Sequence, residues 1–89
     1  MQELTRKRKK FSDSSEQKRS LILYNDDMNH FDFVMESLID VCKHTPEQAE
    51  QCTLIAHFNG SCEIKYGSDK DLIPCHKRLS ERKIIVCIE

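Results

Sequence analysis

Residues 21–43, LILYNDDMNHFDFVMESLIDVCK, indicate how this chain begins to fold. The first four, Leu21–Tyr24, are strand formers, and the Asn and Asp residues that follow leave strands and form turns. Asn29 can then cap a helix. Beyond it, apolar residues recur at steps of three and four, as on one face of a helix. They are Phe31, Val34, Met35, Leu38, Val41 and Cys42. The segment predicts a strand, a turn and an amphipathic helix ending near residue 43.

A second helix is predicted to begin at Thr45. Residues 45–48, TPEQ, combine an N-cap, a proline in the first turn and a glutamine at the third helical position. Gly60 is a typical C-terminal stop. Residues 62–66, CEIKY, then alternate with a period of two, as a half-buried strand does. One face of the second helix carries Ala49, Cys52, Thr53 and Ala56.

The last part of the chain predicts one more helix and one more strand. Residues 67–69 are expected to turn the chain, and residues 69–81 have a helical composition. Pro74 lacks an N–H donor and crowds the preceding turn, so we expect that helix to be short, kinked or late-starting. Residues 83–88, KIIVCI, are strongly β-branched and predict a strand. The order β-α-α-β-α-β predicts an α+β fold, with three helices packed on a small three-stranded antiparallel sheet.

Length and composition exclude several classes of protein. With 89 residues, the chain forms one small domain that buries about 60% of its unfolded surface. A barrel or a dinucleotide-binding fold needs a longer chain. Charged residues make up 33%, and no apolar run approaches the ~20 residues of a membrane span. The first ten residues lack the apolar stretch of a secretory signal. We therefore expect a cytoplasmic monomer with no membrane partner.

The net charge of -1 conceals a difference between the two ends of the chain. Residues 1–20 hold seven Lys and Arg against three acidic residues, whereas residues 21–89 hold seven against twelve. We expect 1–20 to be a flexible basic arm and 21–89 to be the folded domain. The basic cluster at residues 6–10 could bind nucleic acid or an acidic protein surface, or it could be a solvated tail. Because the domain is acidic, we expect no nucleic acid as the main partner.

The cysteines and histidines do not form a recognisable metal or catalytic motif. Five cysteines are an odd number, and no Cys-x-x-Cys pair occurs, so we expect reduced, buried thiols rather than disulfides or a zinc site. No motif places a nucleophile beside Asp26, Asp27 or His57, and no phosphate-binding loop occurs. We therefore expect no metal, no cofactor and no catalytic residues, which means that the protein is not an enzyme.

Two motifs in combination resemble the ClpS family of Clp protease adaptors. The first is Leu23–Asp27 followed by a helix beginning FDFV at 31–34, and the second is Ala56-His57-x-x-Gly60 followed by Cys62. The likeness extends over residues 21–89. It implies an adaptor that binds the free α-amino group and bulky apolar first residue of an N-degron substrate. It also implies delivery to the N-terminal domain of a ClpA- or ClpC-type AAA+ unfoldase, with the arm taking part.

The chemistry of amine binding follows from the side chains themselves. An ammonium group carries three N–H donors, so its site needs acceptors only. The amide oxygen of Asn25, the carboxylate of Asp27 and a neutral imidazole at His57 supply one acceptor of each kind. Asp26 adds negative potential nearby. We predict that these four residues bind the α-amino group, which requires the turn and the second helix to meet.

The resemblance also implies an apolar slot between the two helices for the first side chain. The matching residues are Asn29, Phe31, Val34, Thr53, Ala56 and Ile85. From the pattern alone, Val34 and Ile85 could instead be ordinary core, and His57 a core or capping histidine.

Several positions depart from the family pattern. His30 replaces a usual proline, and Phe31 replaces a Met that excludes β-branched side chains. Thr53 stands where an apolar residue is usual, and Ala56 where Val is usual. Residues 68–74 do not match the stretch that contacts the unfoldase in the family. The alternative hypothesis is therefore a ClpS-like interaction module that has lost or altered N-degron specificity and acts on a Clp ATPase or another partner.

Overall fold

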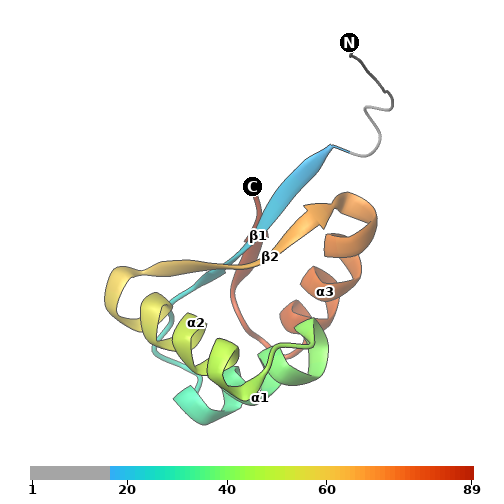
Figure 1. Cartoon of the computed structure of the whole chain (residues 1–89). Helices are drawn as coiled ribbons and strands as arrows, with labels where there is room; N and C mark the ends of the chain where they lie inside the picture. Colours follow the sequence, from blue (N-terminus) through green and yellow to red (C-terminus); the bar gives the residue numbers. More distant parts are fainter. Residues whose placement is uncertain (1–16) are drawn as a thin grey trace.

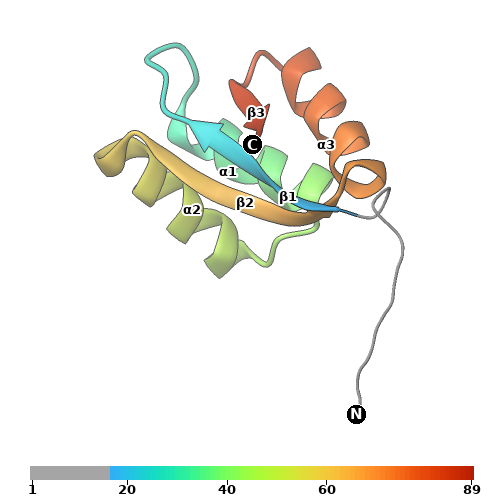
Figure 2. The ribbon, with the colours of Figure 1, turned by 90° about the horizontal axis from the view of Figure 1, so that it is seen from above.

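The computed structural model describes residues 17–89 and arranges three helices on one side of a three-stranded sheet (Figures 1 and 2). The elements are β1 (Lys18–Tyr24), α1 (Phe31–Cys42), α2 (Pro46–Asn59), β2 (Ser61–Ser68), α3 (Asp69–Glu81) and β3 (Val86–Ile88). The predicted order of elements and the α+β class are confirmed. The predicted boundary of the arm at residue 20 falls inside β1, and the rest of the predicted arm, residues 1–16, lies outside the described residues.

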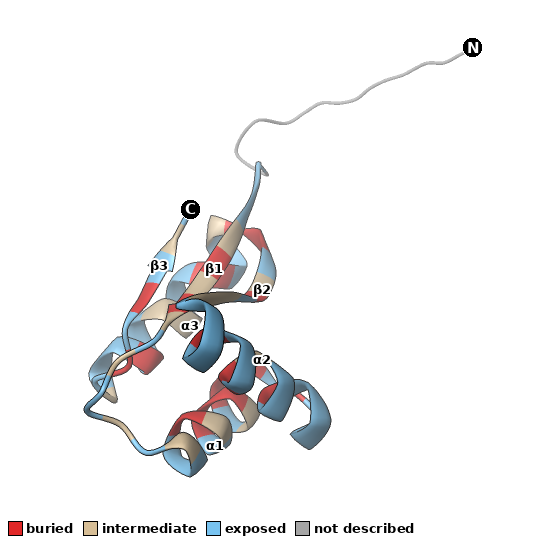
Figure 3. Ribbon diagram, turned by 90° about the vertical axis from the view of Figure 1, so that its left-hand side faces the viewer, coloured by how far each residue is buried: buried red, intermediate tan, exposed pale blue. Residues whose placement is uncertain are grey.

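β1 is the central strand of the sheet, whose order is β2-β1-β3. Both neighbours run antiparallel to it. Leu21 and Leu23 of β1 are buried, because alternate residues of a strand point to the same face and this face carries the helices. The core of the domain lies between that face and the inward stripes of the helices, where buried residues gather (Figure 3). The helices contribute Val34, Leu38, Val41, Cys42, Ala49, Ala56, Leu72 and Leu79 to it.

A buried histidine forms a hydrogen bond to the backbone of the residue that bulges from β2. The register between β1 and β2 shifts between Leu21 and Ile22, so that Ile64 is skipped in the pairing. His44, just beyond α1, places Nε2 2.7 Å from the carbonyl oxygen of Ile64. A carbonyl only accepts, so Nε2 carries the hydrogen and donates it. This bond joins the end of α1 to the middle of the sheet.

The predicted start and stop of α2 are confirmed. Thr45 and Gln48 form a reciprocal capping box, with the backbone N–H of Gln48 donating to Thr45 Oγ1 at 3.1 Å. The helix ends at Gly60, whose φ of 98° lies in the left-handed region that glycine adopts without strain.

The predicted cap of α1 is wrong. The N-cap is His30, whose side chain makes no capping hydrogen bond, and not Asn29. The amide group of Asn29 is instead engaged with Asp26 and with the backbone of Lys83. The Nδ2 donor of Asn29 thus joins the turn to a distant part of the chain.

α3 runs from Asp69 to Glu81 through Pro74, so it is neither short nor late-starting, and the kink expected at Pro74 stays a prediction. β2 leads directly into α3, without the turn expected at residues 67–69. Because Pro74 has no N–H, the helix lacks one backbone hydrogen bond, the one that this residue would otherwise donate to the carbonyl of Lys70. Both residues are exposed, so water can hydrate that carbonyl. Leu72 and Leu79, which are fully buried, hold the opposite side of the helix in the core.

β3 is shorter than the strand predicted for residues 83–88. Lys83 and Ile84, the first residues of that predicted strand, form hydrogen bonds to the end of α3 instead. Lys83 adopts a left-handed φ of 67°, which breaks the extended backbone. Its N–H donates to Ser80 O at 2.9 Å, and the N–H of Ile84 donates to Leu79 O at 3.1 Å. These bonds satisfy the free carbonyls at the end of the helix.

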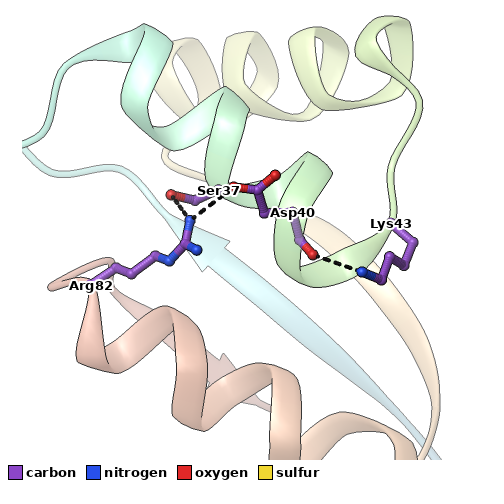
Figure 4. Close-up of polar contacts among 4 residues, drawn as sticks. All are labelled: Ser37, Asp40, Lys43 and Arg82. Atoms are coloured by element: carbon purple, nitrogen blue, oxygen red, sulfur yellow. Dashed lines mark hydrogen bonds and ion pairs between the residues drawn. The ribbon is translucent and has the colours of Figure 1, made fainter.

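Arg82 joins the corner between α3 and β3 to α1 (Figure 4). Its Nη1 donates to Oγ of the fully buried Ser37 at 3.1 Å and lies 3.7 Å from Oδ2 of Asp40. Lys43 donates to the backbone oxygen of Asp40 at 3.1 Å. The ion pair with Asp40 is exposed and contributes little to stability, so the hydrogen bond to the buried Ser37 hydroxyl is the stronger of the two interactions. The corner is thereby held against α1.

The cysteines are free thiols in different environments, and only Cys42 is buried. Burial raises the pKa of Cys42 to about 12, so this thiol stays protonated and acts as an apolar core residue. Cys87 is exposed because it alternates with Val86 along β3, which corrects the expectation that all the thiols are buried.

Within residues 17–89, no three potential metal ligands cluster, and no helix is long and apolar enough to cross a membrane.

We predict that His44→Ala lowers the free energy of unfolding by about 2–4 kcal/mol, because it leaves the Ile64 carbonyl without a partner and opens a cavity. Urea unfolding followed by circular dichroism measures the change. His30→Ala, at an exposed residue with no capping bond, is the control and should change stability by less than about 0.5 kcal/mol. Equal losses in the two variants would contradict the role given to His44.

Candidate functional site

Backbone pairing brings the two sequence motifs together, because the β1–β2 ladder sets Leu23 opposite Cys62 and Tyr24 opposite Ser61. The N–H of Asn25, directly after β1, donates to the carbonyl oxygen of Gly60 at 2.9 Å. Gly60 also ends α2, its own N–H donating to Ala56 O at 2.9 Å. His57 lies in the last turn of this helix. The turn and the end of α2 therefore meet, as the amine-binding hypothesis requires.

A pocket of about 390 Å³ opens where these segments meet. It is lined by Leu23, Tyr24, Asn25, Asp26, Asp27, Asn29, Phe31, Val34, Thr53, Ala56 and His57. These residues come from the end of β1, the turn after it, the first part of α1 and the second half of α2. Every residue predicted for the site lines the pocket except Ile85. Phe31 lines the pocket and does not fill it.

The pocket has a buried floor and a polar rim. Leu23, Val34, Thr53 and Ala56 are each at most 9% exposed and form the floor. Asn25, Asp27 and His57 are exposed and form the rim. A ligand that fits this arrangement has an apolar part that is removed from water and a polar group that stays at the surface.

The three rim side chains keep their acceptor atoms free. Among residues 17–89, the side chains of Asn25, Asp27 and His57 take part in no hydrogen bond or ion pair. The His57 ring packs edge-on against Phe58, with ring centroids 4.9 Å apart. An amide oxygen, a carboxylate and an imidazole nitrogen can therefore all turn to a cationic ligand.

Asp26 has a different role from its two neighbours. Its Oδ1 accepts from the backbone N–H groups of Met28 at 2.8 Å and Asn29 at 2.9 Å. Its Oδ2 accepts from the side-chain Nδ2 of Asn29 at 3.1 Å. Partial burial disfavours its charge, but these hydrogen bonds outweigh that effect and lower the pKa of Asp26. Its carboxylate is thus committed to the turn. The structure makes Asp26 a positioning residue, although its negative charge still lies at the site.

Asn29 extends this connection to the other end of the chain. Its Nδ2 donates to Asp26 and also, at 2.9 Å, to the carbonyl oxygen of Lys83. Lys83 lies in the corner that Arg82 holds against α1. The turn that carries the rim acceptors is therefore fixed to β1, to α2 and to the α3–β3 corner.

Ile85 lies outside the pocket, which corrects the sequence-based prediction. Its side chain is 52% exposed, whereas its neighbours Ile84 and Val86 are buried. In an extended segment, alternate side chains point to opposite faces, so Ile85 faces away from the core. Its backbone oxygen instead accepts from the N–H of Tyr24 at 2.9 Å.

Two lining residues, Leu23 and Tyr24, were not among the predicted pocket residues. Their signal was present in the sequence, because they end a strand directly before Asn25. The Tyr24 hydroxyl donates to the carboxylate of Glu89, which connects this edge of the pocket to the last residue of the chain. That bond also raises the pKa of Tyr24.

Residues 14–83 match the sequence model of the family described as ATP-dependent Clp protease adaptor protein ClpS. The chain belongs to the ClpS family. This family is one of adaptors and not of catalysts.

Among solved structures, the ClpS domain described here is similar to Agrobacterium tumefaciens ClpS2, which was determined bound to L-phenylalaninamide. The TM-score is 0.73 at 19% sequence identity, over 81% of this chain and 94% of that one. At this identity the likeness shows the fold. A comparison with curated proteins by sequence finds no match.

We predict that Asp26→Ala lowers the free energy of unfolding by about 1 kcal/mol at pH 7 and by less near pH 3. The folded-state pKa of Asp26 is lowered, so its ionised form stabilises the fold above about pH 4, the usual range of the unfolded group. That contribution is lost as the pH falls through the folded-state pKa.

Urea unfolding at the two pH values tests this, with Asp27→Ala as the neighbouring control. Asp27 accepts no hydrogen bond from residues 17–89, so its variant should show a smaller loss. If Asp26→Ala is no more destabilising at pH 7 than at pH 3, the positioning role of this carboxylate is wrong.

Proposed function

We propose that this ClpS-family protein binds the free α-amino group and the bulky apolar first residue of N-degron substrates, and delivers them to a Clp AAA+ unfoldase for degradation. The observation that carries this proposal is the position of Asn25, Asp27 and His57 on the rim of a pocket with a buried, largely aliphatic floor. Their side chains have no hydrogen-bond partner among residues 17–89. The first residue of a polypeptide has the complementary pair of groups: an ammonium and, beside it, a side chain.

The polar half of the site suits an ammonium better than an internal peptide bond. Hydrogen bonds from an ammonium are charge-assisted and roughly twice as strong as neutral ones. The carboxylate of Asp27 adds direct attraction, and Asp26 holds a second negative charge in the turn. An internal peptide bond offers one N–H and no charge, so it would leave most of these acceptors without partners.

The apolar half of the site suits one bulky side chain. A volume of about 390 Å³ lies near the lower end of the range for small-molecule pockets. The ligand of Agrobacterium ClpS2, L-phenylalaninamide, combines an aromatic side chain with an amino group. The same pairing of groups fits the floor and rim of the pocket in this chain.

Family membership makes the protein an adaptor of the Clp protease, and the type of unfoldase is part of the proposal. We propose the N-terminal domain of a ClpA- or ClpC-type unfoldase as the partner. We further propose that the basic residues of the arm take part in delivery. Residues 68–74 do not match the family's contact stretch, so docking here uses a different set of side chains on α3.

One observation favours the alternative, an interaction module with altered specificity. Thr53 places a hydroxyl group in the floor of the pocket, where only aliphatic side chains otherwise line it. A ligand chosen by such a pocket can differ from the ligands of other members of the family. Binding to peptides with different first residues distinguishes the two hypotheses.

We predict micromolar or tighter binding to peptides that begin with Phe, Tyr, Trp or Leu, measured by fluorescence anisotropy. Acetylation of the peptide amine should abolish binding, because it removes the charge and two of the three donors. His57→Ala should weaken binding by about 1–3 kcal/mol, or about five- to 150-fold. His76→Ala, on α3 and outside the pocket lining, is the matched control. Equal affinity for free and acetylated peptides would reject the proposal.

We predict that the protein accelerates degradation of a reporter that begins with Tyr by a ClpA- or ClpC-type unfoldase and its peptidase. Removal of residues 1–16 should leave peptide affinity unchanged and slow degradation, because the pocket lies entirely within the remaining domain. Both quantities are measured on the same preparations. Unchanged degradation after truncation would refute a role for the arm, and an absence of stimulation by the full chain would refute delivery.

A further inference from the structure

The floor of the pocket contains one polar side-chain atom, the hydroxyl oxygen of Thr53. The other lining residues that are buried, Leu23, Val34 and Ala56, present only aliphatic groups. Thr53 is 5% exposed, so water has little access to it in the folded domain. Whatever fills the pocket therefore decides the environment of this oxygen.

The hydroxyl of Thr53 can only accept a hydrogen bond from a ligand. Its single proton is donated to the carbonyl oxygen of Ala49, one turn earlier in α2, at 2.7 Å. This is the local bond that threonine commonly makes inside helices. The two lone pairs of the oxygen remain, and a hydroxyl whose proton is engaged is an acceptor.

The position of Thr53 on α2 places this acceptor at depth. Thr53 precedes the rim residue His57 by four residues, which is about 6 Å along the helix axis. Residues four apart share one face of a helix, and Ala56 lies on the same face of α2. A residue whose ammonium group is held at the rim extends its side chain past Ala56 toward Thr53.

From this arrangement we infer that Thr53 makes the pocket prefer first residues whose side chains carry a hydrogen-bond donor far from the backbone. Tyr has a phenol O–H and Trp an indole N–H in that position, whereas Phe and Leu have neither. A Phe or Leu side chain covers the Thr53 oxygen without giving it a partner, and an acceptor that is buried unpaired costs free energy. The inference rests on the proposed function and specifies its substrate class.

The test compares peptides that differ only in the first side chain. For the full chain, a peptide beginning with Tyr should bind about three- to tenfold more tightly than its Phe counterpart, which is the usual contribution of one neutral hydrogen bond. A peptide beginning with Trp should exceed one beginning with 1-methyltryptophan, which lacks the indole N–H, by a similar factor. Fluorescence anisotropy gives the four dissociation constants.

Thr53→Val removes the oxygen and keeps the shape of the side chain, so the ratio of the Phe to the Tyr dissociation constant should fall to about one. Thr53→Ser retains an acceptor and should keep the preference. Urea unfolding verifies that both variants are folded. Because the readout is a ratio within one variant, a general loss of affinity does not change it.

The outcomes separate the inference from the proposed function. If peptides with a free amine bind but Tyr is not preferred over Phe, or if Thr53→Val keeps the preference, the inference is wrong and the proposed function stands. If no peptide with a free amine binds the unmodified chain, the proposed function itself fails and the inference fails with it.

Discussion

The hydrogen bond from the N–H of Asn25 to the carbonyl oxygen of Gly60 is the constraint on which the site depends. It joins a turn that follows the first strand to the end of the second helix, two segments about 35 positions apart in sequence. Gly60 can serve both neighbours because its left-handed backbone stops α2 and turns its carbonyl toward β1. This junction places the amide and carboxylate of the turn and the imidazole of the helix around one pocket.

Further hydrogen bonds hold the turn in place in a domain that has a small hydrophobic core. Asp26 accepts from two backbone amides, and Asn29 connects it to the carbonyl of Lys83. The corner at Lys83 is in turn held to α1 by Arg82 through the buried Ser37. An 89-residue chain has few apolar side chains to spare for positioning a surface turn. Hydrogen bonds with charged and backbone partners supply that positioning here.

The site divides its chemistry between a wet rim and a dry floor. Acceptors at the rim that have no partner within residues 17–89 suit a cation that remains partly hydrated, and the aliphatic floor suits a side chain that leaves water. Thr53 is the exception in the floor, with its proton already committed to Ala49. The floor of the pocket is therefore aliphatic except for one hydroxyl oxygen, whose lone pairs are its only side-chain acceptor.

Local patterns in the sequence by themselves determined the order of the elements, the capping box at Thr45 and the stop at Gly60, because each depends on residues within one or two turns. Only the tertiary structure decided the roles of Asn29 and Asp26, the short β3 and the exposure of Ile85. Asn29 does not cap α1, and its Nδ2 instead donates to the carbonyl of Lys83, a residue far along the chain. Partners of that kind are set by how the elements pack, which no periodicity within a single segment encodes.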